Sequence, residues 1–301
     1  SSHIYSTYFA PRGRSRIYTL GMQIAQLYLS PFDQIIGFIG EAGSGKSVLI
    51  KGMFPGIELT NDDDGVNVRP LPLLEQEYET GFFTPHTYHL DIRFETGFHQ
   101  LSELADAVRL AVRRGKRIII EHFDLIYPLL GVNANLLIGV GEQIVITRPN
   151  LFGPLPQELC DIVYPSLAYR LMAHSAEDLC EYAMTQEQML ACSHGDIRHG
   201  FVLEFNEHQP DIDIPTLESR VNELIRADLP IDYYDESHIL LGGVQHYCTG
   251  PRTHVRSTGR IIGFRLLDHF IYDHFHKTYM LVGCVGDDSE ENIRKLEKIH
   301  G

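Results

Sequence analysis

Ile35-Ile-Gly-Phe-Ile-Gly-Glu-Ala-Gly-Ser-Gly-Lys-Ser47 is the stretch that decides the fold of the first half of the chain. Its opening run, 35–39, is short and continuously apolar, as in a parallel strand that is buried on both faces. The next residues, 40–47, fit the pattern G-x4-G-K-[ST],. Residues 47–53 then follow a helical pattern. A buried strand that enters a glycine-rich loop, and a helix that leaves it, predict a phosphate-binding loop.

Each residue type in this loop has a physical role. Glycines let successive backbone N–H groups converge on a triphosphate, and the helix N-terminus adds a partial positive charge. Lys46 is expected to reach the β- and γ-phosphates, and the Ser47 hydroxyl to hold Mg²⁺. The loop therefore predicts a site for ATP and Mg²⁺ formed by Gly40, Glu41, Ala42, Gly43, Ser44, Gly45, Lys46 and Ser47.

Apolar runs and helical patterns alternate around this loop. Such alternation predicts an α/β unit with a doubly wound, mostly parallel sheet. The strands are expected at 35–39, 56–60, 86–94, 117–121 and 143–147, with a helix at 101–114. Pro-Asn and Gly-Pro steps in 148–156 indicate a loop, so the first domain is predicted to span 1–160.

Acidic and basic side chains follow three of these strands. Asp62 and Asp63 close the second strand, where a carboxylate could hold Mg²⁺ or accept a proton from an attacking hydroxyl; a solvated turn is the alternative. Glu121 ends its strand as a second candidate ligand of Mg²⁺, or as a strand-end cap. Arg148 is either a lid arginine that clamps phosphates or a loop arginine in solvent.

The composition limits the class of protein. The net charge is −15, which repels nucleic acid unless a local basic patch opposes it,. No apolar run approaches the roughly 18 residues of a membrane span. Five cysteines without a CxxC pair argue against a disulfide scaffold and for a reducing compartment,. We therefore expect a cytoplasmic protein without a membrane partner.

The second half has a different pattern and is predicted to be a separate α+β domain over 161–301. Residues 165–190, 215–227 and 288–300 look helical, whereas 200–205, 237–247, 261–267 and 279–285 look like strands. Pro215 lies in the first turn of its helix, a favoured position.

Residues 33–150 resemble the nucleoside-kinase branch of the P-loop proteins, especially uridine kinase. The likeness rests on the loop, on the Asp-rich end of the second strand and on an hhhE strand that ends at Glu121. GTPase signatures of the NKxD type are missing. The resemblance implies ATP-dependent phosphoryl transfer to a small hydroxyl compound whose identity stays open.

Three stretches of the second half resemble the editing domains of threonyl- and alanyl-tRNA synthetases. They are 215–231, with a VN-x-x-I and LP-I pattern; 247–264, with V-x-x-T-G-x-I; and a helix that begins near His174. The family's site is a zinc ion held by HxxxH and Cys-x3-His. The resemblance implies zinc bound by His174, Asp178, Cys248 and His254.

Two departures from that pattern affect the zinc prediction. Asp178 stands where the family has the second His, and its i,i+4 spacing from His174 keeps both on one helix face. Cys248 lies six residues before His254 instead of four, and Gly250 occupies the usual Cys position. The alternative is an editing-like domain that has lost its ion.

Residues 246–277 form a basic strip that is a candidate contact for RNA. Its five cations exceed its two Asp, so it could meet a tRNA end or an aminoacyl-nucleotide, or it is a solvated face. The other histidines, at 194, 199, 269, 274 and 276, match no ligand spacing and are expected to be structural. The cations are Arg252, Arg256, Arg260, Arg265 and Lys277.

The leading hypothesis is an ATP-dependent phosphotransferase of nucleoside-kinase type with an appended tRNA-editing-like domain. In it Lys46 stabilises the transferring phosphoryl group, and Asp62 or Asp63 orients the acceptor. Two alternatives stay open: an aminoacyl-tRNA editing hydrolase with a regulatory P-loop ATPase domain, and a nucleotide-sensing binding module.

Overall fold

The computed structural model describes residues 5–59, 61–62, 65–66 and 86–300. The chain divides into two compact units, the first comprising 1–10 and 14–166 and the second 11–13 and 167–301. The sequence places the boundary at 160/161, whereas this division falls at 166/167, inside helix α7 (Pro156–Ala183).

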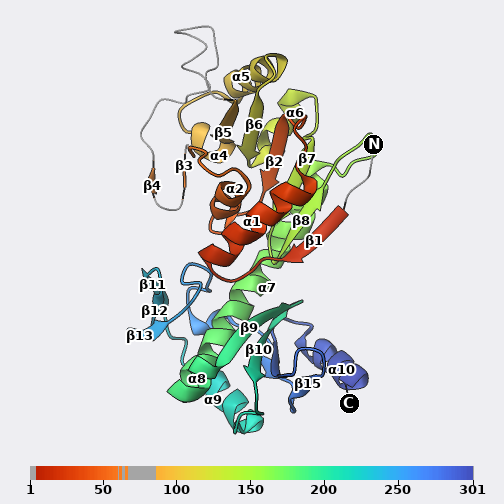
Figure 1. The fold of residues 1–301 in the computed structure, drawn as a ribbon. Coiled ribbons are helices and arrows are strands. Elements are labelled where there is room, and N and C mark those ends of the chain that lie inside the picture. The colour runs from red at the N-terminus through yellow and green to blue at the C-terminus, as the bar shows by residue number, and fades with distance from the viewer. Residues whose placement is uncertain (1–4, 60, 63–64, 67–85, 301) are drawn as a thin grey trace. The chain divides into compact units, whose positions relative to one another are not determined.

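The first unit contains a six-stranded sheet in the order β1-β8-β7-β2-β6-β5 (Figure 1). Strands β7, β2, β6 and β5 are parallel, while β8 and β1 are antiparallel additions at one edge. The mostly parallel α/β sheet expected from the sequence is present. The strands are β1 (Tyr5–Phe9), β2 (Ile35–Ile39), β5 (Thr87–Asp91), β6 (Arg117–Glu121), β7 (Leu136–Val140) and β8 (Gln143–Thr147).

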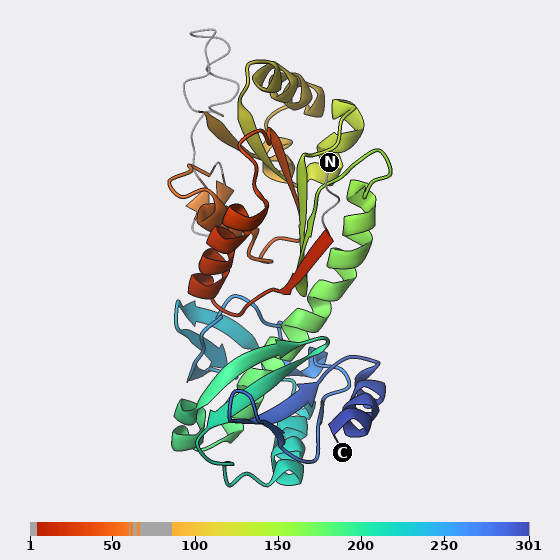
Figure 2. The same ribbon diagram turned by 45° about the vertical axis from the view of Figure 1, so that its right-hand side comes forward.

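Helices cover both faces of this sheet (Figure 2). Side chains alternate along β2, so Ile36 and Phe38 face one layer and Ile35 and Ile39 the other,. The first layer holds α1 (Arg14–Tyr28) and α2 (Lys46–Met53). The second holds α5 (Leu101–Arg113), α6 (Phe123–Leu130) and the first part of α7; α4 (Ile92–Glu95) is a single turn after β5.

Several predicted elements match and one does not. The strands expected at 35–39, 117–121 and 143–147 are confirmed as β2, β6 and β8. The strand expected at 56–60 is wrong over the described residues 56–59, which form no strand. The short β3 (Asn61–Asp62) pairs with β4 (Gly65–Val66) as a separate ribbon. Strand β7 and helix α6 were not expected.

The second unit is built on an antiparallel sheet of the order β14-β16-β10-β9, with β15 beside β16. The second part of α7 and α9 pack on one face, and α10 on the other. A three-stranded sheet, β11-β12-β13, completes the α+β arrangement. The bounds are β9 (Cys192–Ile197), β10 (Gly200–Asn206), β11 (Ile231–Asp235), β12 (His238–Leu241), β13 (Val244–Tyr247), β14 (Arg265–Leu266), β15 (Ile271–Asp273), β16 (Thr278–Cys284), α8 (Gln186–Ala191), α9 (Ile214–Arg226), the 3-10 turn Thr258–Arg260 and α10 (Ser289–His300).

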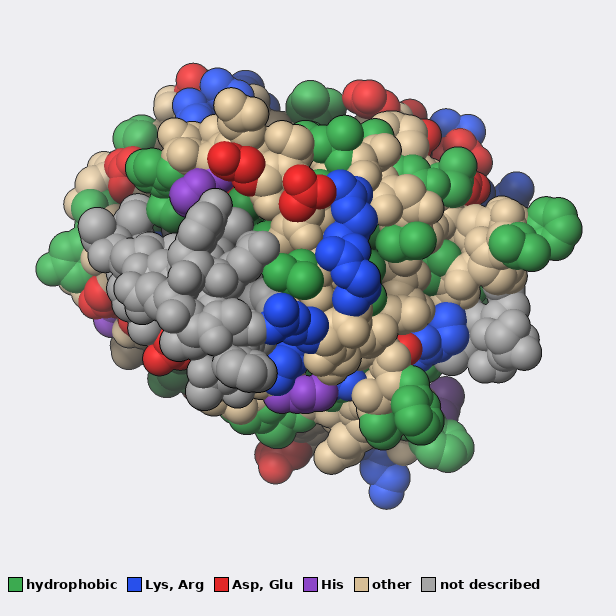
Figure 3. All heavy atoms as spheres, turned by 90° about the horizontal axis from the view of Figure 1, so that it is seen from above, with side chains coloured by type: hydrophobic (Ala, Val, Ile, Leu, Met, Phe, Trp, Pro, Cys, Tyr) green, Lys and Arg blue, Asp and Glu red, His purple; other side chains and the backbone are tan. Residues whose placement is uncertain are grey.

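Two further properties of the chain concern its surface. Among the described residues, no helix is both long enough and apolar enough to cross a bilayer. Lys and Arg side chains gather in a row on one face (Figure 3), although the net charge of the whole chain is −15. The surface charge is therefore uneven.

Candidate nucleotide and metal sites

The glycine-rich loop connects the carboxyl end of β2 to the first turn of α2. Gly45 immediately precedes the helix with φ 95°, and Gly43 has φ 77°, both in the left-handed region that favours glycine,. Lys46 is buried, and its Nζ donates to the carbonyl oxygens of Gly40 at 2.9 Å and Glu41 at 2.7 Å. The loop thus holds its lysine folded back over its own backbone.

Gly43 offers a test of this loop that avoids steric overlap. A Cβ added there meets nothing within 4 Å, so Gly43→Ala is expected to cost only the strain of its left-handed backbone, roughly 1–2 kcal/mol,. The control is Gly115→Ala, since Gly115 has φ 75° and equally open space. Both should lose similar stability on thermal unfolding, and only Gly43→Ala should weaken ATP binding in calorimetry. Equal ATP affinities of Gly43→Ala and Gly115→Ala would contradict a role for this loop in ATP binding.

The parallel strands β2, β6 and β5 end at the same edge of the sheet as the loop, and two of them end in a carboxylate. Glu121 ends β6, and in the register of the sheet it lies beside Phe38 of β2 and Asp91 of β5. Because carboxyl ends of neighbouring parallel strands share one crevice, these groups and the loop face the same ligand position. Glu121 is buried, and its Oε2 lies 2.7 Å from Nε2 of His89. His89 therefore orients the carboxylate.

The electrostatics of this edge keep Glu121 ionised. Burial acts to raise its pKa, but the hydrogen bond with His89 and the positive charge of Lys46 outweigh burial, and the pKa is lowered. The next residue, His122, has φ 55° and precedes α6. Burial and the charge of Lys46 lower the pKa of His122, so this imidazole is neutral at pH 7. A non-glycine residue in this conformation beside a ligand edge is a feature often found at functional sites.

The strand order corrects the position predicted for the backbone of Asp62. Asp62 lies in β3, which pairs only with β4 among the described strands and does not belong to the six-stranded sheet. Asp63 lies outside the described residues. The strand next to β6 is instead β5, so the carboxylate at this position is Asp91. Asp91 is buried and caps α4 by accepting from the backbone N–H of Phe94 at 3.2 Å.

Arg148 lies at the opposite end of the sheet from the loop. Strand β8 runs antiparallel to β7, so the end of β8 returns to the amino ends of the parallel strands. There the Nη1 of Arg148 bonds Oδ1 of Asp33 at 2.6 Å, and its Nη2 donates to the carbonyl oxygen of Tyr28 at 2.7 Å. This corrects the prediction of a lid arginine, because Arg148 ties together the segment before β2.

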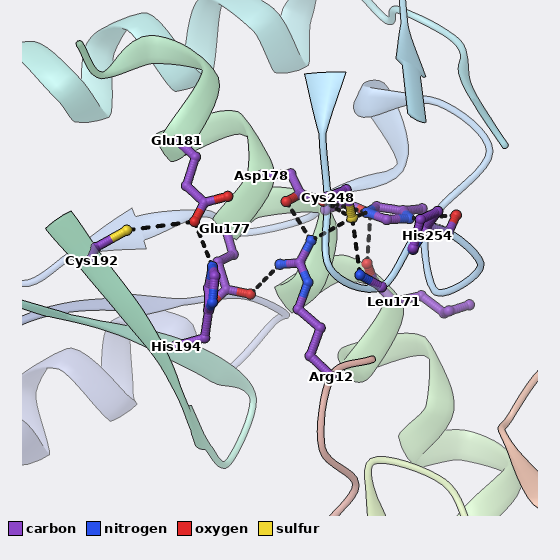
Figure 4. A network of polar contacts seen from close by, with 12 residues as sticks. Arg12, Leu171, Glu177, Asp178, Glu181, Cys192, His194, Cys248 and His254 are labelled. Atoms are coloured by element: carbon purple, nitrogen blue, oxygen red, sulfur yellow. Dashed lines mark hydrogen bonds and ion pairs between the residues drawn. The ribbon is translucent and has the colours of Figure 1, made fainter. Parts of the chain in front are cut away.

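The second unit has a buried polar centre on α7 (Figure 4). Sγ of Cys248 lies 3.3 Å from Oδ2 of Asp178 and 3.8 Å from Nε2 of His254, and this imidazole is hydrogen-bonded to the same carboxylate. The ligand atoms of all three residues lie within 4.8 Å of one another, close enough for one metal ion. Three of the four residues predicted to bind zinc therefore come together.

His174 does not join this group. It is buried, and its Nδ1 has no hydrogen-bond partner within the described part of the chain. Burial, followed by the positive charges of Arg12 and Arg170, holds the pKa of His174 well below its ordinary value. His174 is therefore a neutral imidazole beside the centre.

Arg12 provides the positive charge of the centre. Its guanidinium forms ion pairs with Glu177 and Asp178 and donates to Sγ of Cys248 at 2.9 Å. A side chain at Gly250 would meet Cγ of Arg12, with a Cβ only 2.8 Å away. The position where the editing pattern has its cysteine is thus kept open for the arginine.

The buried charges around Arg12 respond to it in different ways. Burial acts to raise the pKa of Asp178, but the charge of Arg12 and the hydrogen bond with His254 outweigh it and hold that pKa well below its ordinary value. Burial raises the pKa of Glu177 to about 7 despite Arg12, and that of the Cys248 thiol to about 12. Metal binding here would require displacement of the guanidinium and loss of the thiol proton.

The remaining predicted groups form surface pairs. His199 stacks on Tyr169 at 3.6 Å between ring centroids and pairs with Asp288, and His276 pairs with Asp273. Within the basic strip, Arg252 pairs with Glu236 at 3.2 Å and Arg265 with Glu290 at 3.5 Å. Both arginines already have acidic partners.

Sequence reasoning missed several residues of these sites. Asp91 ends strand β5, and the alternating pattern of this strand is visible in the sequence. Arg12 gives no local signal, since it lies more than 160 residues from Glu177 in the chain. No protein-family model and no curated protein matches the chain. The resemblances to nucleoside kinases and editing domains therefore rest on the residues themselves.

Proposed function

We propose that the protein is an ATP-dependent, Mg²⁺-requiring phosphotransferase of nucleoside-kinase type. The observation that carries the proposal is the meeting of the glycine-rich loop, Glu121 and Asp91 at the carboxyl edge of three adjacent parallel strands. A loop alone fits any nucleotide-binding protein. A second carboxylate one strand further from the loop favours transfer to an acceptor.

The residues at this edge would have two roles, one toward the nucleotide and its metal and one toward the acceptor. Lys46 and the loop N–H groups would bind the β- and γ-phosphates and stabilise charge on the transferring group. Ser47 and Glu121 offer the hard oxygen donors that suit Mg²⁺. A bound Mg²⁺ would offset the negative charge of the phosphates. Asp91 would orient the acceptor hydroxyl and accept its proton, the role the sequence assigned to Asp62 or Asp63.

Asp91→Asn tests the acceptor side. Asn is also a good helix cap, so α4 should keep its first turn while the proton acceptor is lost. Transfer of the γ-phosphate label of ATP to a mixture of nucleosides should slow by about 10²-fold or more, with ATP affinity nearly unchanged. Asp62→Asn is the matched control and should transfer at the normal rate.

Two results would redirect the proposal. Label released only as inorganic phosphate, whatever hydroxyl compound is supplied, would favour an ATPase or a switch. Binding of ATP with no turnover would favour a nucleotide sensor. A larger loss in Asp62→Asn than in Asp91→Asn would return the acceptor role to the Asp-rich turn.

A second candidate function is hydrolysis of mischarged aminoacyl-tRNA by the second unit. It is favoured by the group of Asp178, Cys248 and His254, whose donors suit zinc once the thiol is deprotonated,. Deacylation of a mischarged tRNA that is lost in His254→Ala would support it. If zinc-loaded protein does not deacylate mischarged tRNA, this second function is rejected and only the kinase function remains proposed.

A further inference from the structure

A second group of buried ligands lies next to the cysteine-containing group of α7. Asp178 and Glu181 are three residues apart on α7 and share a helix face. His246 comes from β13. Their ligand atoms all lie within 4.8 Å of one another, and all three residues are buried. We propose that Asp178, Glu181 and His246 bind a divalent transition-metal ion, at a position next to that of Cys248 and His254, with Asp178 common to both groups.

His246 has an unsatisfied imidazole in this group. Along β13 the neighbouring residues Val244, Gln245 and Tyr247 are exposed, whereas His246 is only 7% exposed. Its Nε2 is buried and has no hydrogen-bond partner in the described part of the chain. Buried polar atoms in proteins are nearly always paired. A metal ion would satisfy this nitrogen.

The balance of buried charge also calls for a cation. Glu177, Asp178 and Glu181 are buried on one helix, and Arg12 is the one guanidinium paired with them among the described contacts. Glu181 also lies beside the imidazole of His194, and burial raises the pKa of Glu177 to about 7, so the excess negative charge is carried mainly by Asp178 and Glu181. Buried charges are paired or coordinate metals because an isolated one is costly. A cation bound by Asp178 and Glu181 would reduce this excess of negative charge.

The donor set indicates which metals suit the site. Two carboxylates and one imidazole, with no thiolate, favour Mn²⁺, Co²⁺ or Zn²⁺ over Mg²⁺. Nε2 of His194 lies 2.5 Å from Oε1 of Glu181 and so orients that carboxylate from outside the group. Such partners commonly support a ligating side chain. The rings of Tyr182 and His246 pack edge to face, with their centroids 5.7 Å apart.

Titration of the chelator-stripped full chain with Co²⁺ tests the proposal independently of any enzymatic activity. Cobalt bound by Cys248 shows thiolate charge-transfer absorption, whereas cobalt bound only by nitrogen and oxygen does not. Cys248→Ser is expected to retain one equivalent of Co²⁺ without that absorption. His246→Gln in the Cys248→Ser background should weaken this binding by about 100-fold. His238→Gln, on the neighbouring strand β12, is the matched control and should bind normally.

The outcomes show which of the two groups of residues binds the cobalt ion. Absence of bound cobalt in Cys248→Ser, or unchanged affinity after His246→Gln, overturns the proposal. Circular dichroism of the metal-free variants checks their folding. If His246→Gln does not fold, Glu181→Gln replaces it with the same expected loss. The kinase proposal rests on the first unit and is unaffected by either result.

Discussion

Lys46→Met is expected to lower nucleotide turnover by about 10²- to 10³-fold, or more, because in the proposed function Lys46 is the cation that stabilises the transferring phosphoryl group. The side chain is buried, and its Nζ bonds the carbonyl oxygens of Gly40 and Glu41. On nucleotide binding these contacts would be exchanged for phosphate oxygens. Met keeps most of the aliphatic stem, so the packing of α2 should survive, and steady-state turnover with γ-labelled ATP measures the loss.

The same variant must be shown to fold. The two lost charge-assisted hydrogen bonds should cost about 3–6 kcal/mol together, within the roughly 5–15 kcal/mol of a typical domain's stability. Lys51→Met changes the same residue type in the last turn of α2 and should leave turnover intact. Retained turnover in folded Lys46→Met would remove this loop from the catalytic centre.

Arg12→Met is expected to give the largest loss of stability. Arg12 has a side chain only 1% exposed and pairs with the buried carboxylates of Glu177 and Asp178. Removing one partner of a buried ion pair costs about 3–5 kcal/mol because the remaining charge stays buried and unpaired. Urea unfolding of chelator-treated protein, fitted for the transition of the second unit, measures this free energy.

An exposed arginine gives the reference for that measurement. Arg16 lies on the exposed side of α1, and Arg16→Met should change the free energy of unfolding by less than about 0.5 kcal/mol,. If Arg12→Met loses no more free energy of unfolding than Arg16→Met, the guanidinium of Arg12 does not stabilise the buried carboxylates.

Local patterns were sufficient for several elements of the first unit. The apolar run 35–39, the loop and the runs 117–121 and 143–147 each lie where expected, because a fully buried strand must be continuously apolar,. The run 56–60 has similar residues but forms no strand over 56–59. Strand β5 takes the outer parallel position instead, and pairing between distant segments is not encoded in either segment alone.

The same limit affects the predicted positions of Asp62 and Arg148. Both were placed by assuming that consecutive strands run parallel and lie side by side. Strand β8 is antiparallel, so Arg148 lies at the amino ends of the parallel strands, and β3 is outside the sheet. Asp91 takes the position beside Glu121 because β5 pairs with β6 in parallel register.

The sequence by itself determined the glycine-rich loop between β2 and α2, the α/β class of the first half and three of the residues gathered beside α7. These features depend on short spacings: glycines at fixed steps in a loop, or Asp178 on one helix and Cys248 close to His254 in one turn. Only the tertiary structure decided which carboxylate adjoins Glu121, that Arg12 supplies the positive charge of the second unit's centre, and that His246 lies beside Asp178 and Glu181. Those contacts join segments far apart in the chain, and burial, which sets their charge states, exists only once the segments have packed together.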